Sequence, residues 1–191
     1  MNWMNIFKKK TLSPNDLAKS IVLASAKCTE VIKNEIDKKY GQDSKEAITK
    51  WMEVQYEFLF FFMHLAMRSA QSRLGFKNSN KLQNILYPII KDTTTQIWFG
   101  HWPKKYQEGV KAKFIDDVNI AEIEYSKCKA LIVKNQPYSD GLIQKLAFNV
   151  SKISGLKNFA TVAISTDITL KLYIEMKLDQ LIDSVNLEGN I

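Results

Sequence analysis

The stretch EFLFFFMHLAMRSA, from Glu57 to Ala70, is the most apolar part of the chain, yet it contains three ionisable side chains. If the stretch is helical, Glu57, Phe61, His64 and Arg68 fall at i, i+4, i+7 and i+11 and share one stripe of the helix. Most other positions are Phe, Leu, Met or Ala. This pattern predicts a long helix that is buried over most of its circumference and carries one polar stripe.

The polar stripe has two interpretations. It is a network inside the protein, in which Glu57 sets the tautomer of His64 and Arg68 holds an anion or a carboxylate. Alternatively, it is the narrow solvent-facing edge of a mostly buried helix. The second interpretation fits the extension of the stripe into Lys50, Glu53, Gln71 and Ser72, whereas Phe60 and Phe61 fit the first better. The sequence leaves both open.

Helix signals surround this stretch on both sides. Ser13 suits an N-cap, Pro14 the first helical position and Asp16 the third, so a helix is expected to begin here and to end at Gly41. A second helix is expected from Asp43, with Glu46 in capping-box spacing, to Leu74, where Gly75 stops it.

The second half of the chain continues the pattern. We expect a helix over 79–99 with a kink or a break near Pro88, and a helix over 104–133. A short helix capped by Ser139 or Asp140 follows the loop 136–140 and ends before Gly155. The segment 156–185 is rich in β-branched residues, but its apolar spacing favours a helix over a strand.

Together these segments predict an all-α fold: an antiparallel bundle of four long helices plus one or two shorter helices. Seven Gly and four Pro in 191 residues agree with long helices and few turns. The length suits one core, so we expect an N-terminal arm over 1–12 and a single helical-bundle domain over 13–191.

The charge of the chain argues against nucleic-acid binding. The formal net charge is +7, but only two of the 27 basic residues are Arg. Arg is the side chain that suits base edges and bidentate phosphate contacts. Residues 1–10 place Trp3, Met4, Ile6 and Phe7 before three Lys, so an alternative hypothesis has this arm lying on an anionic membrane surface.

Cysteine usage and missing motifs narrow the chemistry. Cys28 and Cys128 stand alone, as buried free thiols do in a reducing compartment, and we expect a cytoplasmic protein. The chain contains no GxxxxGK[ST], GxGxxG, HExxH or GxSxG motif. With two His, neither preceded by Glu at three residues, we expect no di-iron site, no metal and no cofactor.

Further acids lie on apolar helical segments. Asp167 falls on the core line of the last segment, and Glu122 and Glu124 flank the core line of the segment 104–133. If these helices face the polar stripe, His64 and Arg68 are natural partners for the acids, because a buried acid is costly unless paired. The alternative is that Asp167 marks a helix boundary or bend and that Glu122 and Glu124 face water. The candidate polar site comprises Glu57, His64, Arg68, Glu122, Glu124 and Asp167.

Aromatic residues concentrate near the turn at residues 98–103. This cluster lines a pocket mouth or an interface in one interpretation, and locks a helix turn onto the core in the other. The candidate aromatic pocket or interface comprises Phe61, Trp98, Phe99, His101, Trp102 and Tyr125.

The leading functional hypothesis is a non-enzymatic helical-bundle protein that binds a partner protein or a small apolar ligand. The competing hypothesis is a bundle enzyme or metal-binding protein that uses Glu57, His64 and Arg68, and no catalytic residue is assigned. A third is a peripheral membrane protein held by residues 1–10. The apolar helix around Phe61 also makes a homodimer an open expectation.

Overall fold

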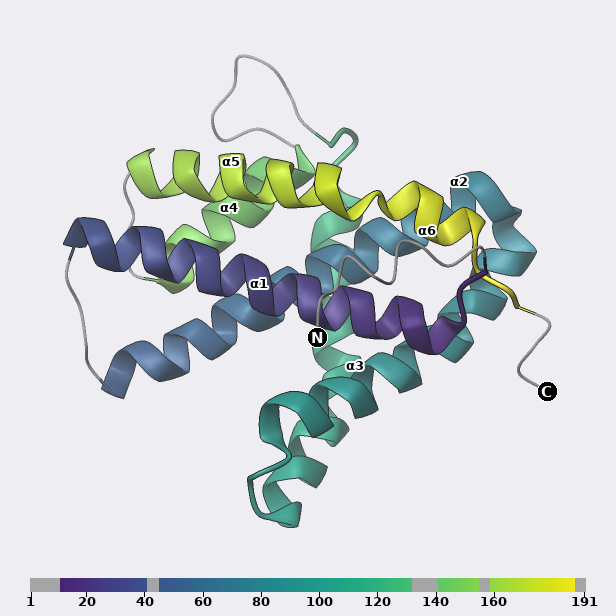
Figure 1. The fold of residues 1–191 in the computed structure, drawn as a ribbon, viewed down its shortest axis with the longest axis horizontal. Helices are drawn as coiled ribbons and strands as arrows, with labels where there is room; N and C mark the ends of the chain where they lie inside the picture. The colour runs from purple at the N-terminus through teal and green to yellow at the C-terminus, as the bar shows by residue number, and fades with distance from the viewer. Residues whose placement is uncertain (1–10, 41–44, 132–140, 155–158, 188–191) are drawn as a thin grey trace. The chain divides into compact units, whose positions relative to one another are not determined.

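The first helix begins where the sequence predicts it. A computed structural model describes residues 11–40, 45–131, 141–154 and 159–187, and α1 spans Pro14–Tyr40 (Figure 1). The backbone N–H of Asp16 donates to Oγ of Ser13 at 3.2 Å, and the Asp16 carboxylate accepts the Ser13 hydroxyl at 2.9 Å. The predicted N-cap is therefore confirmed.

The second helix, α2, spans Lys45–Phe99 and contains the EFLFFFMHLAMRSA stretch. Its backbone leaves helical angles at Gly75, with φ 75° and ψ 169°, so the predicted interruption at Gly75 is confirmed. Helical structure resumes on the far side of Gly75. The break expected near Pro88 is wrong, because α2 continues through Pro88, and the kink expected there stays a prediction.

The third helix, α3, spans Lys104–Ser126 and ends about two turns before the predicted end near 133. The N–H of Cys128 closes a turn onto the carbonyl of Tyr125 at 3.0 Å. The carbonyl of Ala130 then accepts the N–H of Leu142 at 2.9 Å. After Ser126 the backbone therefore forms a turn and bonds to the start of α4, in place of the helix expected to 133.

The chain ends in three shorter helices: α4 over Leu142–Ile153, α5 over Phe159–Met176 and α6 over Leu178–Asp183. The N-cap of α4 is Gly141, so the cap expected at Ser139 or Asp140 is wrong. The β-branched segment around 161–169 is helical, as its spacing predicts. The expected single helix to residue 185 is divided at Lys177, whose left-handed φ of 46° separates α5 from α6.

Several sequence expectations fall outside the described residues. They are the arm over 1–10, the end at Gly41, the cap at Asp43, the loop 136–140 and the break at Gly155. Within the described ranges the chain forms six helices and no strand, so the all-α class is confirmed.

The chain divides into two compact units. Unit 1 comprises Met1–Leu23, Met63–Ile120 and Lys177–Ile191, and unit 2 comprises Ala24–Phe62 and Ala121–Met176. Whether they act as the single antiparallel bundle domain that the sequence suggests stays a prediction.

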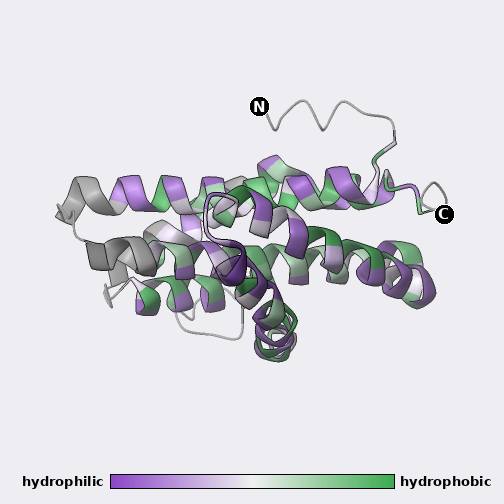
Figure 2. Cartoon of the chain, turned by 90° about the horizontal axis from the view of Figure 1, so that it is seen from below, coloured by the Kyte–Doolittle hydropathy of each residue, from purple (hydrophilic) through white to green (hydrophobic). Residues whose placement is uncertain are grey.

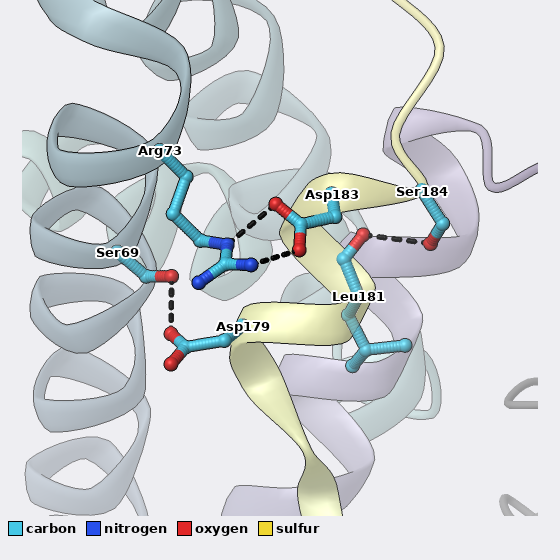
Figure 3. Close-up of polar contacts among 6 residues, drawn as sticks. All are labelled: Ser69, Arg73, Asp179, Leu181, Asp183 and Ser184. Carbon is cyan, nitrogen blue, oxygen red and sulfur yellow. Dashed lines mark hydrogen bonds and ion pairs between the residues drawn. The ribbon is translucent and has the colours of Figure 1, made fainter.

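In unit 1, α6 is tied to the part of α2 that precedes Gly75 (Figure 3). The Arg73 guanidinium forms a bidentate ion pair with Asp183, and the Ser69 hydroxyl donates to Asp179 at 2.6 Å. The N–H of Leu12 donates to the Ser184 carbonyl at 2.7 Å, just ahead of α1. Segments from both ends of the chain are therefore bonded within this unit.

In unit 2, α4 packs against α5, and its buried side chains lie at helical spacing. The Phe-rich part of α2 supplies three of the largest buried side chains: Phe58, Phe61 and Phe62.

Hydrophilic and hydrophobic residues alternate along the helices of the chain (Figure 2). In the described part of the chain, every helix is too short or too polar to cross a lipid bilayer.

Candidate functional site

The polar stripe of α2 is exposed at its ends and buried in its middle. Lys50 and Glu53 are exposed, Glu57 is partly buried, and Phe61 is fully buried. His64 is 4 % exposed. Arg68 is partly buried, and Gln71 and Ser72 are exposed again. The solvent-facing interpretation therefore describes the two ends of the stripe, and the buried interpretation describes its middle.

Glu57 forms the centre of a polar cluster that joins three helices of unit 2. Its Oε1 atom accepts a hydrogen bond from the Tyr125 hydroxyl on α3. The same oxygen accepts from Nδ2 of Asn149 on α4 at 2.6 Å. Phe61 lies one helical turn from Glu57 on α2, and the Tyr125 ring of α3 meets it with ring centroids 5.7 Å apart.

Burial dominates the electrostatics of this cluster. It raises the pKa of Glu57, while the hydrogen bonds from Tyr125 and Asn149 act in the opposite direction. Burial also raises the pKa of Tyr125 well above its ordinary value, and the Glu57 charge adds to the rise. The proton therefore stays on the Tyr125 oxygen, which donates, and Glu57 accepts.

A second carboxylate lies at the rim of the cluster. Glu124 on α3 accepts from the Lys145 ammonium on α4 at 3.0 Å. This hydrogen bond lowers the pKa of Glu124, and a hydrogen bond from Asn149 contributes to the lowering. Glu57 and Glu124 have pKa values shifted in opposite directions because one is buried and the other is exposed and paired.

The remaining candidate polar residues lie elsewhere. His64 and Arg68 belong to unit 1, so the predicted network of Glu57, His64 and Arg68 is divided between the units. Glu122 is partly buried on α3. Asp167 is exposed inside α5 and pairs with Lys171 at 2.7 Å, so it occupies neither the expected core line nor the expected helix boundary. A functional role for these residues stays a prediction.

The candidate aromatic residues are also divided between the two units. Phe61 and Tyr125 are core side chains of unit 2. In unit 1, Phe99 is buried and meets the exposed Trp102 edge to face at 5.3 Å. Trp98 is partly buried, and His101 is exposed and accepts the indole N–H of Trp102 at 2.9 Å. The cluster therefore has a side that packs on the core and a side that faces solvent.

A groove between α1 and α5 of unit 2 was not predicted from the sequence. Its volume is about 480 Å³. The lining residues are Lys27, Val31, Glu35, Asp167, Ile168, Lys171 and Glu175. The lining residues lie four apart on α1 and share one face of α5, and this helical spacing is the only sequence signal that could have indicated the groove. The pairing of α1 with α5 is a tertiary property.

In the described ranges, no group of three or more His, Cys, Asp or Glu side chains is placed to hold a metal ion. Comparison of the chain with family models, with curated proteins and with solved structures gives no match. Functional inference therefore depends on the geometry of the two units.

Proposed function

We propose that this chain is a non-enzymatic binding protein whose α1–α5 groove takes a small ligand with an apolar body and a cationic group. The supporting observation is the groove itself, about 480 Å³ in volume within one unit. Pockets that hold small molecules measure about 300–1,000 Å³. A ligand of this size therefore fits between the two helices.

The lining selects the chemistry of the ligand. Val31 and Ile168 are its less exposed members, whereas the charged members face solvent. A wholly apolar ligand would remove water from five charged side chains, which is costly. We therefore favour an amphipathic ligand over the purely apolar one that the sequence suggested.

The net charge of the residues that line the groove favours a cationic ligand. Three carboxylates and two lysines line it, in a chain whose formal net charge is +7. Both lysines are in ion pairs, Lys27 with Glu30 at 2.9 Å and Lys171 with Asp167 at 2.7 Å. These pairs compensate the lysine charges locally, so we assign Glu175 as the carboxylate that meets the ligand.

The direction of the helices spreads the charges along the groove. In Figure 1, α1 and α5 run antiparallel, so the Glu35 end of α1 lies toward the Asp167 end of α5. Lys27 then lies toward Glu175. A cation bound to Glu175 would accordingly have its apolar body directed along Val31 and Ile168.

The enzymatic alternative has weaker support. The Glu57 carboxylate accepts hydrogen bonds from two protein donors, Tyr125 and Asn149, which cross-link three helices. A raised pKa is common in catalytic acids, but a buried structural carboxylate has one for the same reason. Glu57 is accordingly assigned a structural role in this proposal.

The test is an NMR titration of the full chain with three probes of equal length: hexylammonium, 1-hexanol and hexanoate. We expect amide shifts in residues 27–35 and 167–175. Hexylammonium should bind roughly two- to fivefold more tightly than hexanol, which is the range of an exposed ion pair, and hexanoate more weakly still.

Two variants locate the contact. Glu175→Gln should reduce the preference for hexylammonium over hexanol, whereas Glu53→Gln, which removes an exposed carboxylate of α2, should leave it unchanged. Equal affinity for all three probes, or shifts confined to residues outside the groove, would contradict the proposal.

A further inference from the structure

The turn between α2 and α3 presents aromatic, aliphatic and basic side chains to solvent within unit 1. We call residues 97–106 the hairpin tip. Ile97 is 49 % exposed, Trp102 38 % and Tyr106 61 %. Lys104 and Lys105 are exposed beside them. The Trp102 and Tyr106 rings are in contact, and exposed apolar side chains that adjoin on a surface indicate an interaction site.

Hydrogen bonds and ring contacts hold the tip in one conformation. The N–H of Trp102 donates to the Phe99 carbonyl at 2.8 Å, and the Gln107 amide donates to the Trp102 carbonyl at 2.8 Å. The Trp102 ring meets Phe99 and Tyr106 edge to face, at 5.3 and 6.2 Å. The side chains are therefore ordered before any partner arrives, which lowers the entropic cost of binding.

The backbone of the turn is equally specific. A Cβ atom at Gly100 would lie 2.4 Å from the carbonyl oxygen of Gln96, so the tight turn requires glycine. Further from the tip, Lys111 on α3 pairs with Asp92 on α2 at 2.6 Å. The two helices thus hold the tip from both sides.

The charge of the tip is entirely positive. No Asp or Glu occurs over residues 93–107, whereas Lys104 and Lys105 both lie there. Trp and Tyr have an apolar ring and a polar atom, and Lys has an apolar stem and a cationic end. These side chains are the ones that suit the boundary between water and an anionic bilayer.

We propose that the hairpin tip binds an anionic lipid surface. Ile97, Trp102 and Tyr106 enter the headgroup region, and Lys104 and Lys105 contact the lipid phosphates. Each lysine near such a surface strengthens binding by about fivefold at low to moderate salt. The tip is part of unit 1, so this function is independent of the α1–α5 groove.

A nucleic acid is the other anionic partner, and the tip suits it less well. Single-strand binders stack successive bases on open aromatic faces. Here Trp102 already meets the rings of Phe99 and Tyr106, and Ile97 offers no face for stacking. The tip also contains no Arg, the side chain that combines charge with a stacking plane.

Vesicle flotation of the full chain tests the proposal. We expect the protein to float with vesicles of 70 % phosphatidylcholine and 30 % phosphatidylserine, and not with phosphatidylcholine alone. Lys104→Gln combined with Lys105→Gln should weaken binding more than about tenfold. Trp102→Ser combined with Tyr106→Ser should weaken it similarly.

Matched controls lie on α2 in the same unit. Phe76→Ser removes an aromatic side chain that is 71 % exposed, and Lys77→Gln with Lys81→Gln removes two exposed charges. These variants should float as the wild type does. Circular dichroism and thermal melting check that each variant is folded, and the lysine pair tests the proposal even if the aromatic pair unfolds.

Three results would overturn the proposal. One is flotation of the tip variants at wild-type level, as expected if residues 1–10 carry the binding. Another is an equal loss in the α2 controls. The third is binding of a 20-nucleotide oligothymidylate, measured by fluorescence anisotropy, in a protein that does not float with vesicles. In that case the binding would depend on Trp102 and Tyr106.

Discussion

Glu57 is the residue on which the polar chemistry of unit 2 depends. Burial raises its pKa, and the hydrogen bonds from Tyr125 and Asn149 offset only part of the rise. The carboxyl group joins α2 to α3 and α4. The free energy that its burial costs is offset because it keeps the hydrogen-bonding groups of Tyr125 and Asn149 paired. At the residue scale it is a cross-link whose strength varies with pH.

The raised pKa of Glu57 makes a prediction with a definite sign. Between the ordinary value of 4.5 and the raised value, the folded state holds a proton that the unfolded state has released. The free energy of unfolding therefore falls as the pH rises through this window. Glu57→Gln is neutral throughout and can still accept both hydrogen bonds. We expect it to gain stability relative to the wild type from pH 4.5 to pH 7, by urea denaturation.

Glu124 is the matched control, because its pKa is lowered by the hydrogen bond from Lys145. The stability that its charge supplies is present above the unfolded-state pKa and is lost as the pH falls through the folded-state pKa. Glu124→Gln should therefore lose stability relative to the wild type at pH 7, and the difference should shrink toward low pH. Parallel pH profiles for the two variants would contradict the assignment.

At the scale of elements, the ends of helices divide into those with local causes and those with distant ones. The start of α1 depends on Ser13 and Asp16, three residues apart, and the sequence predicts it. The interruption of α2 depends on Gly75 itself. Beyond the end of α3, the carbonyls of Ala130 and Leu131 bond to residues beyond 140, a pairing that no local pattern reveals.

The two glycines Gly75 and Gly109 predict opposite responses to alanine. Gly75 has φ 75° and ψ 169°, a region nearly restricted to glycine, and a Cβ there would touch nothing within 4 Å. Gly75→Ala should therefore cost about 1–3 kcal/mol through backbone strain alone. Gly109 lies inside α3 with open space around it, so Gly109→Ala should stabilise by about 1 kcal/mol.

Chemical denaturation of the two glycine variants measures both effects on one scale. A neutral Gly75→Ala would show that the protein in solution does not adopt the left-handed conformation at this position. A destabilising Gly109→Ala would show that α3 has a packing partner at this position.

At the scale of the whole molecule, the two cysteines report on unfolding. Cys28 and Cys128 are buried and are not joined in a disulfide, and burial raises the pKa of the Cys28 thiol. A thiol reacts as its thiolate and only where a reagent reaches it, so these two buried thiols should be inert in the folded protein. We expect negligible reaction with a disulfide reagent such as dithionitrobenzoate within minutes at pH 8, and two thiols per chain in 6 M guanidinium chloride. Prompt reaction of Cys128 alone would indicate local opening after α3.

The sequence by itself determined the helical class, the cap of α1 and the interruption at Gly75. These follow from periodicity and from single residues, which act over three or four positions. It also identified Glu57, Phe61 and Tyr125 as residues of interest. It could not predict that Tyr125 and Asn149 donate to Glu57, because the partners are 68 and 92 positions away.

Only the tertiary structure decided which side chains share a site. It placed Asp167 in solvent beside Lys171 and Glu57 among donors from two other helices. It also aligned α1 with α5 to form a groove from residues more than 130 positions apart. The physical reason is that helical periodicity states which face of a helix is apolar, whereas the choice of the neighbour that covers it depends on packing between segments distant in sequence.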